Sequence, residues 1–443
     1  MTFDEFWATA VGLIWGLPLV FMLFGAGALF TVMSRLLPLR RAHYAFKILS
    51  GRYDKATDPG EISHFQALST ALSATIGMGN IAGVAVAITM GGSGAVFWMW
   101  VAGALGMATK YFSCTLSCLY RQRDADGVWQ GGPMYYIELG MGKRFKPLAV
   151  MFALSGTVGC LGIFQANQLA NLMSNQWSVA NWATGLIAMS LVGIVVVGGV
   201  GRIGRVARFV VPAMCLFYVV GSLIVVLDHV DRVPAVLAAI VFGAFDPDAL
   251  IGGGAGIAFK EILIVGVKRA VFSNEAGVGT AALAHGAART SEPVREGLVA
   301  MIGPFIDTHL ICTLTALVIL TSGVAPHDAG VVMTALAFES SMPGFGASVL
   351  AIVFTLFALS TMVSYAYYSQ KCARYLFGKR RGGHFIYVYL LLLPCGAVWH
   401  PTTTINIIDS AFALMVIPNL IACIYLAPKV LEATSDYFRR YPS

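Results

Sequence analysis

The sequence predicts an all-α integral membrane protein, and its composition and long apolar segments carry that prediction. Of the 443 residues, 58% are hydrophobic and only 12% are charged, with a mean hydropathy of +0.76. Soluble domains carry roughly twice that share of charge. A membrane-spanning helix needs about 20 apolar residues, and about eleven segments qualify. In chain order they are 11–33, 65–88, 94–119, 147–173, 182–199, 207–227, 254–288, 297–322, 346–370, 384–399 and 403–427. We expect residues 1–443 to form a single membrane domain.

The basic residues gather in alternate loops. If the N-terminus lies outside, the cytoplasmic loops hold 24 of the 29 Lys and Arg, and the outside loops hold only Arg232. This pattern follows the positive-inside rule. We therefore predict a multi-pass protein of a prokaryotic cytoplasmic membrane, with its N-terminus outside and its C-terminus in the cytoplasm. The net charge of +7 then marks the cytoplasmic face, so we expect membrane lipid around the chain and no nucleic-acid partner.

Glycine interrupts the second candidate span, in the run LSATIGMGNIAGV at 72–84. An unwound helix in hydrocarbon leaves backbone groups unpaired, which is tolerated only where they line a cavity or hold a ligand. Exposed N–H groups at the start of the second half-helix would suit a carboxylate, and freed carbonyls at the end of the first would suit Na⁺. Thr75 adds a hydroxyl group. The alternative is close helix packing through glycine. A dinucleotide-binding loop is excluded because no strand precedes this run.

A second interruption, AVFSNEAGVGTAAL at 270–283, places Ser273, Asn274 and Glu275 inside the span 254–288. Polar residues at membrane depth usually face a cavity or a pathway. Lys268 and Arg269 come one to two turns earlier, so an ion pair with Glu275 competes with a gating or ion-binding role for that residue. Broken helices in both halves of a chain are the best sequence pointer to a transporter's binding site.

A hydroxyl pair, Ser360 and Thr361, lies in the span 346–370, and Tyr365 follows on the same helix face as Thr361. We expect the two hydroxyl groups to reach a cation beside the first break. The alternative is a bond from each hydroxyl to a carbonyl one turn earlier, without further function.

Three other polar residues lie in or near apolar segments: Gln165, Asp307 and Asp409. Gln165 follows Gly159 and Gly162, which would share one helix face, so it would line a groove or close a packing seam. For Asp307 and Asp409 we favour hydrogen-bonded structural roles, with proton transfer as the alternative. None of the eight Cys has metal-ligand or disulfide-framework spacing.

Taken together, these segments resemble the alanine or glycine:cation symporter family from about residue 12 to 425. The matching runs are IWGLPL (14–19), ATIGMGNIAGVAVAI (74–88), FWMWVAGALGMATKY (97–111), GGPMYYIELGMG (131–142), QAN (165–167), FSNEAGVGTAALAHGAA (272–288), FIDTHLICTLTALVIL (305–320), ST (360–361) and MVIPNL (415–420). The resemblance implies the leucine-transporter-like fold. Two inverted five-helix repeats, about 62–230 and 250–428, would follow one extra N-terminal helix at 11–33.

The resemblance also implies roles for particular residues. Na⁺ would be held by the carbonyls of Ser73, Ile76 and Phe357 and by the hydroxyls of Ser360 and Thr361. The substrate carboxylate would meet Thr75, Gly77 and Gly79, its amino group would meet the second break at Phe272, Ser273 and Asn274, and Gln165 and Tyr365 would complete the pocket. Tyr365 stands where the family usually has Trp, which should change the size or polarity of the pocket.

The implied activity is Na⁺-coupled import of small neutral amino acids, chiefly alanine and glycine, by alternating access. No organic cofactor is expected, and one copy of the chain should suffice. Proton coupling and glutamine selectivity remain open as alternatives. A membrane-embedded enzyme is disfavoured because no nucleophile–base or metal constellation is evident, and a channel because no repeated acidic ring is present.

Overall fold

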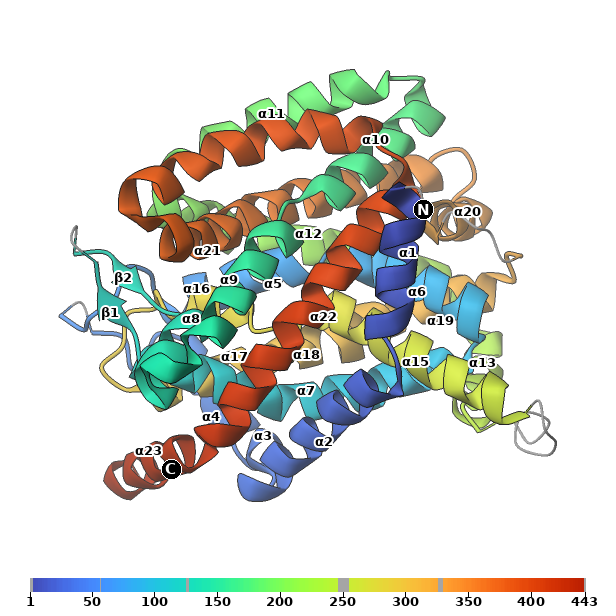
Figure 1. Ribbon diagram of the computed structural model, residues 1–443. Helices are drawn as coiled ribbons and strands as arrows, with labels where there is room; N and C mark the ends of the chain where they lie inside the picture. Colours follow the sequence, from blue (N-terminus) through green and yellow to red (C-terminus); the bar gives the residue numbers. More distant parts are fainter. Residues whose placement is uncertain (1–2, 56, 125–126, 246–254, 326–329, 442–443) are drawn as a thin grey trace.

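The computed structural model describes residues 3–55, 57–124, 127–245, 255–325 and 330–441. These residues are overwhelmingly helical, which confirms the predicted all-α class (Figure 1). A short antiparallel hairpin of β1 (Gln122–Arg123) and β2 (Trp129–Gln130) is the exception that the sequence did not suggest.

The N-terminal part is not one continuous helix. It consists of α1 (Phe3–Ile14), α2 (Leu17–Met33), α3 (Leu37–Arg40) and α4 (Ala42–Leu49). The predicted helix at 11–33 is wrong at its start because Gly16 has an extended backbone and Pro18 opens the first turn of α2. Trp15 then donates its indole N–H to the carbonyl oxygen of Asp409 at 2.9 Å, which ties this junction to a distant helix.

The first half of the remaining chain contains the first predicted break. Its elements are α5 (His64–Thr75), α6 (Met78–Gly91), α7 (Gly94–Leu119), α8 (Pro133–Tyr136), η1 (Ile137–Met141), η2 (Lys143–Phe145), α9 (Lys146–Gly159), α10 (Ile163–Trp177), α11 (Asn181–Val196) and α12 (Gly199–Asp228). The expected span 147–173 lies within a segment that could cross a membrane, Lys143–Trp177, but the expectation for its two glycines is wrong because the helix is interrupted between them. Gly162 adopts φ 64° between α9 and α10, so Gly159 and Gly162 do not share a face of one helix.

The second half contains the second predicted break. Its elements are η3 (Val230–Arg232), α13 (Val233–Gly243), α15 (Ala255–Asn274), α16 (Ala281–His285), α17 (Pro293–Ala300), α18 (Ile302–Pro304), η4 (Phe305–Cys312), α19 (Thr313–Ser322), α20 (Gly330–Ser341), α21 (Gly346–Val398), α22 (Pro401–Tyr425) and α23 (Ala427–Arg440). The predicted spans 346–370 and 384–399 are two arms of α21, which bends at Gly378 (φ 72°, ψ 177°).

The two broken helices lie between other helices of the bundle (Figure 1). The first half of the first broken helix, α5, packs on α12 and α21. Its second half, α6, packs on α15, which also packs on α7. By length and composition, six helical segments in the described part of the chain could cross a membrane unaided. Eleven crossings therefore stay a prediction, because breaks divide several of the other spans.

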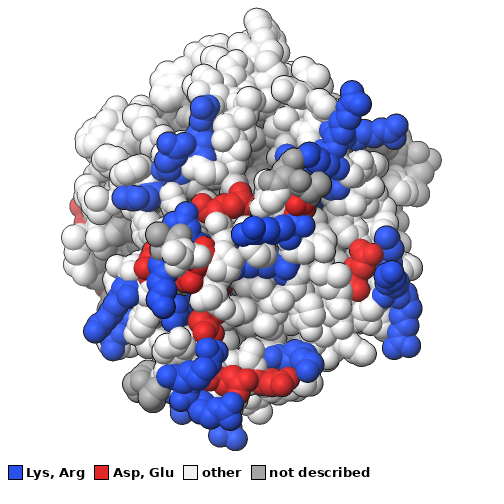
Figure 2. All heavy atoms as spheres, turned by 90° about the vertical axis from the view of Figure 1, so that its left-hand side faces the viewer, with Lys and Arg blue, Asp and Glu red and all other residues white. Residues whose placement is uncertain are grey.

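Charge is distributed unevenly over the surface. Figure 2 shows Lys and Arg gathered on the side of the molecule where β1, β2 and α23 lie. This is the side that the sequence assigns to the cytoplasm.

Candidate functional site

The first break is built by glycines that allow close contact with two other helices. A Cβ at Gly77 would lie 2.7 Å from the Thr361 hydroxyl oxygen, and a Cβ at Gly79 would lie 2.7 Å from the Ser273 Cα. A larger residue at either position would force its neighbour to shift. The Gly77 N–H donates to the side-chain oxygen of Asn80 at 2.8 Å, which orders the unwound turn. The break therefore touches both α21 and the second break.

The hydroxyl pair on α21 meets the end of α5. Thr361 donates to the carbonyl oxygen of Ser73 at 3.1 Å, and Ser73 donates its own hydroxyl to the carbonyl oxygen of Ser360 at 2.7 Å. Ser360 in turn donates to the carbonyl oxygen of Phe357 at 2.9 Å. Four of the five predicted cation-binding residues are thus linked by hydrogen bonds, and Ile76 precedes the glycine that touches Thr361. Carbonyl and hydroxyl oxygens of this kind are the ligands that hard cations prefer.

The second break is a short stretch with left-handed backbone. Glu275, Gly277 and Gly279 have φ values of 54°, 90° and 93°. The Glu275 side chain is 1% exposed and accepts hydrogen bonds from Tyr365, at 2.5 Å, and from Thr280. A non-glycine residue in this backbone region is uncommon, and its buried carboxyl group is held by two hydroxyl donors.

Of the two roles left open for Glu275, the ion pair with the preceding basic residues is not formed in the structure. Lys268 and Arg269 both contact one carboxylate oxygen of Asp409 on α22, at 2.7 and 2.9 Å. They lie one to two helical turns from Glu275 on α15 and face α22 instead. Asp409 therefore has the structural role that the sequence favoured, between α15 and α22.

Asp307 joins the two breaks, a contact that the sequence did not reveal. This buried carboxylate accepts from the Asn80 side chain at 2.7 Å, from Ser273 at 2.7 Å and from Thr308 at 3.0 Å. It lies in η4, where the helix has a π-type turn. An acidic residue in an apolar segment already indicated a special role for Asp307. Its partners Ser273 and Asn80 could not be predicted because they lie 34 and 227 residues away in the sequence.

Aromatic rings enclose the other side of the second break. The Phe272 ring centroid lies 5.6 Å from that of Phe164 and 6.1 Å from that of Phe412, and Phe412 lies 6.3 Å from Tyr365. A cavity of about 440 Å³ is lined in part by Phe164, Phe272 and Arg269. We expect this cavity to lead a small molecule toward the two breaks.

Two predicted substrate residues present different kinds of group. The Gln165 side-chain oxygen is buried without a hydrogen-bond partner among the described residues, which leaves an acceptor for a ligand. The Asn274 side chain donates to Thr308 at 2.9 Å and accepts from the Ala276 N–H at 2.8 Å. Its side chain is thus occupied. Because α15 ends at Asn274, the carbonyls of Phe272, Ser273 and Asn274 have no following helical N–H group.

Thr75 lies at the end of α5 and donates to the carbonyl oxygen of Leu72 at 3.4 Å. It is 4% exposed. The predicted residues of both breaks therefore gather in the interior, between α5, α15 and α21.

Comparison with known proteins gives a consistent result. The sequence profile of the sodium:alanine symporter family matches residues 1–442. The chain is 36% identical to the sodium/alanine symporter AgcS of Methanococcus maripaludis, over 99% of this chain and 98% of that protein. It is 33% identical to the probable sodium/glutamine symporter GlnT of Bacillus subtilis, over 97% and 89%.

A solved structure supports the fold. The crystal structure of MhsT in complex with L-phenylalanine aligns with a TM-score of 0.58 at 15% identity, covering 83% of this chain and 89% of that one. This likeness shows the leucine-transporter-like fold that the sequence predicted.

Proposed function

Because the chain belongs to the sodium:alanine symporter family, and is therefore an amino-acid symporter rather than an enzyme, we propose that it imports alanine and glycine together with Na⁺. The observation that carries the proposal is the contact of Gly77 with Thr361. It brings the hydroxyl pair of α21 against the same unwound turn that faces the second break.

Na⁺ would bind at the C-terminal end of α5, near Ser73 and Ile76. Their carbonyls, that of Phe357 and the hydroxyls of Ser360 and Thr361 supply five oxygen atoms. In the structure these hydroxyls donate to carbonyls of the same set. Rotation of each O–H bond would turn an oxygen lone pair toward the cation without moving the backbone.

The amino acid would bind between the two breaks. Its carboxylate would meet the Gly79 N–H, the Thr75 hydroxyl and, in place of the Asn80 side chain, the Gly77 N–H, at the positive end of α6. Its ammonium group would meet the carbonyls that end α15, from Phe272 to Asn274. The rings of Phe272 and Tyr365 would bound the space for its side chain, and Gln165 would provide one polar contact.

Coupling follows from this shared turn. The carbonyl side of the first break would hold Na⁺ and its N–H side would hold the carboxylate, so each ligand orders the turn that the other needs. One Na⁺ crossing a potential of about 100 mV supplies roughly 2.3 kcal/mol for uptake. The side rich in Lys and Arg would face the cytoplasm (Figure 2). We place the chain, as a functional monomer, in a prokaryotic cytoplasmic membrane.

Glutamine is the second candidate substrate. The relationship to a probable sodium/glutamine symporter favours testing it. Tyr365 also favours this test, because it stands where the family usually has Trp and should change the size or polarity of the pocket.

Uptake of radiolabelled alanine, glycine and glutamine into proteoliposomes tests the proposal. We expect an inward Na⁺ gradient to drive uptake of alanine or glycine in the wild type and in Thr355→Ala, and uptake to collapse in Thr361→Ala. Thr355 is the matched control because it lies on the same helix and bonds only to the Ala351 carbonyl among the described contacts. Uptake that follows a pH gradient and ignores Na⁺ would overturn the choice of ion, and uptake of glutamine alone would overturn the choice of substrate.

A further inference from the structure

A basic pocket lies where the chain from the end of α2 to the start of α4 meets α23 (Figure 1). Its volume is about 430 Å³, and Arg35, Arg40 and Arg41 line it together with Ser34 and Ser435. No acidic residue is among the described residues that line it. Because arginine stays charged in proteins, the pocket brings three positive charges and two hydroxyl groups to one place on the surface.

The backbone and one aromatic ring hold two of these arginines in place. Arg35 and Leu36 both have left-handed backbone, with φ values of 55° and 58°, which is uncommon for residues other than glycine. The Leu36 N–H donates to the Thr31 carbonyl at 2.9 Å and closes this turn. The Arg41 guanidinium lies over the Phe438 ring of α23, 4.3 Å from its centroid. Stacking occupies the face of the guanidinium, so the N–H groups at its edge are left for an anion.

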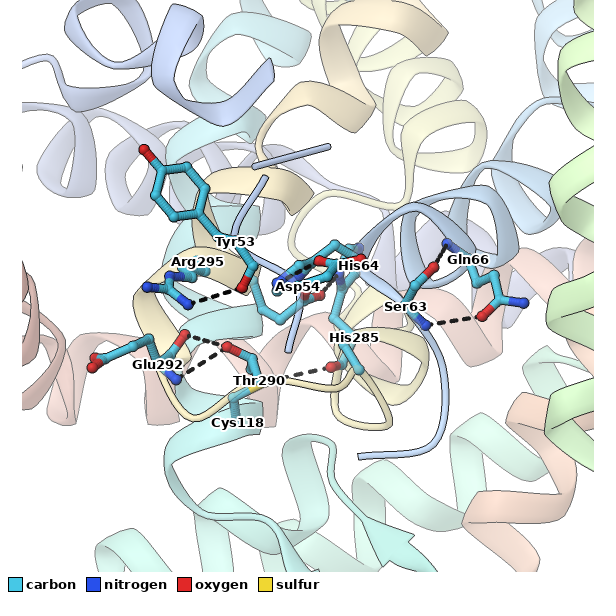
Figure 3. Close-up of polar contacts among 12 residues, drawn as sticks. Tyr53, Asp54, Ser63, His64, Gln66, Cys118, His285, Thr290, Glu292 and Arg295 are labelled. Atoms are coloured by element: carbon cyan, nitrogen blue, oxygen red, sulfur yellow. Dashed lines mark hydrogen bonds and ion pairs between the residues drawn. The ribbon is translucent and has the colours of Figure 1, made fainter. Parts of the chain in front are cut away.

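The three arginines have no acidic partner among the described residues. Arg40 makes one long hydrogen bond, of 3.4 Å, to a backbone carbonyl. Arginines of neighbouring segments have protein acceptors instead: Arg440 pairs with Glu292 at 2.6 Å, and Figure 3 shows Arg295 donating to the Tyr53 carbonyl. Because like charges gathered in one place repel each other, the pocket favours an anion from outside the chain.

Apolar side chains beside the arginines place the pocket at the edge of the membrane. Leu36 and Leu39 are 50% and 75% exposed, and α2, which ends at Met33, is apolar along its length. Leu431 and Phe438 of α23 form an apolar part of the lining. Arginines next to exposed leucines at the end of an apolar helix are typical of the boundary between hydrocarbon and lipid head groups. The pocket can therefore contact a head group and the start of an acyl chain.

We propose that this pocket binds the phosphate group of an anionic membrane phospholipid. The edges of arginine side chains match phosphate oxygens, and basic pockets between helices at this level suit charged head groups. Phosphatidylglycerol would offset part of the positive charge, whereas phosphatidylcholine would bring a cation of its own. The lipid would join the segment of α2 to α4 to α23, which already meet through the hydroxyl groups of Tyr44 and Tyr437 at 2.7 Å. The site is separate from those proposed for Na⁺ and the amino acid.

Protection of an engineered cysteine from labelling tests the proposal at the pocket itself. Ser435→Cys places a thiol in the lining, and Ser50→Cys places one at an exposed position outside it. In the full-length protein in detergent, dioleoylphosphatidylglycerol should slow labelling of the first thiol by N-ethylmaleimide and leave the second unchanged, read by peptide mass spectrometry. Dioleoylphosphatidylcholine should protect far less. Equal protection by the two lipids, or protection by neither, would overturn the proposal.

Arginine variants measure what the pocket contributes. A basic residue near a membrane surface contributes about fivefold to lipid affinity, so Arg35→Gln with Arg40→Gln should raise the phosphatidylglycerol concentration for half-protection of the Ser435→Cys thiol about 25-fold. Lys429→Gln with Arg439→Gln is the matched control, because it removes the same charge from exposed ion pairs of α23 outside the lining. We expect the control to match the parent protein. Equal shifts in the two double variants would contradict a specific pocket.

Free phosphate is another source of the same chemistry. Inorganic phosphate should neither protect the Ser435→Cys thiol nor reverse its protection by phosphatidylglycerol. Reversal by inorganic phosphate at the concentration of the lipid would overturn the choice of a lipid. If thermal melting shows that the double variant does not fold, Arg35→Gln alone should still raise the half-protection concentration about fivefold. An unchanged concentration in that folded variant would refute the proposal.

Discussion

The contact between Gly77 and Thr361 gives the sharpest prediction of the proposed ion site. In Gly77→Ala, the new methyl group would lie 2.7 Å from the Thr361 hydroxyl oxygen and 3.9 Å from the Phe357 carbonyl oxygen. Real Cβ contacts are essentially never below 3.0 Å, so the Thr361 side chain must move by a few tenths of an ångström or rotate. Rotation would break its 3.1 Å bond to the Ser73 carbonyl, and a shift would distort that bond.

The size of the effect follows from that displacement. Overpacking in a tight interior costs about 1–3 kcal/mol, and the strain falls on atoms that we assign to Na⁺. If the strain acts on ion binding, the Na⁺ concentration for half-maximal uptake should rise between about 5-fold and 150-fold. The assay is alanine uptake as a function of Na⁺, with thermal melting of the purified protein as a check on folding.

Gly83→Ala is the matched control for this prediction. It belongs to the same glycine run, but its Cβ would lie 3.8 Å from the Met78 carbonyl, an ordinary contact. We expect its Na⁺ dependence to stay within about twofold of the wild type, because a methyl group added without a steric clash changes stability little. A folded Gly77→Ala with wild-type Na⁺ dependence would refute the placement of the cation beside Thr361.

Three further predictions concern stability. Asp409→Asn leaves the buried Arg269 and the half-buried Lys268 of α15 with a neutral partner, so it should lower the free energy of unfolding by about 3–5 kcal/mol. Asp436→Asn is its control, because Asp436 pairs with Arg439 on the exposed surface. Equal melting temperatures for the two Asn variants would contradict the ion-pair role. Asp307→Ala should cost about 1–3 kcal/mol per hydroxyl or amide donor left without its acceptor, and unchanged melting would refute its role in joining the breaks. The hydrogen bond from Tyr375, together with a nearby lysine, holds the pKa of Glu138 below its ordinary value. Its carboxylate therefore stabilises the fold above about pH 4.5, and that stabilisation is lost as the pH falls further. Melting curves of Glu138→Gln should show a smaller loss between pH 6 and pH 3.5 than the wild type, and parallel curves would contradict this.

The sequence was informative where local chemistry conflicts with a membrane helix. Glycines at 77 and 79, and three polar residues at 273–275, are unfavourable in a continuous span, so both breaks could be predicted. The hydroxyl pair at 360–361 was visible too. Its contact with the end of α5 was expected partly through the family resemblance.

Other features depended on partners far along the chain. Lys268 and Arg269 pair with Asp409, about 140 residues later, and no local pattern distinguishes that partner from Glu275. The bend at Gly162 was missed for a related reason, whereas the bend at Gly378 lies in the gap that the sequence left between the spans 346–370 and 384–399. A glycine in an apolar segment is equally compatible with close packing and with a left-handed bend, and only the neighbouring helices decide between the two.

The central claim is that the two breaks and the hydroxyl pair form one coupled site for Na⁺ and a small amino acid. Equilibrium binding of radiolabelled alanine to the purified protein, measured over a range of Na⁺ concentrations, tests it most directly. We predict that alanine affinity rises with Na⁺ in the wild type and in Thr355→Ala, and that this dependence disappears in Thr361→Ala. Equal Na⁺ dependence of alanine binding in all three proteins would contradict the claim.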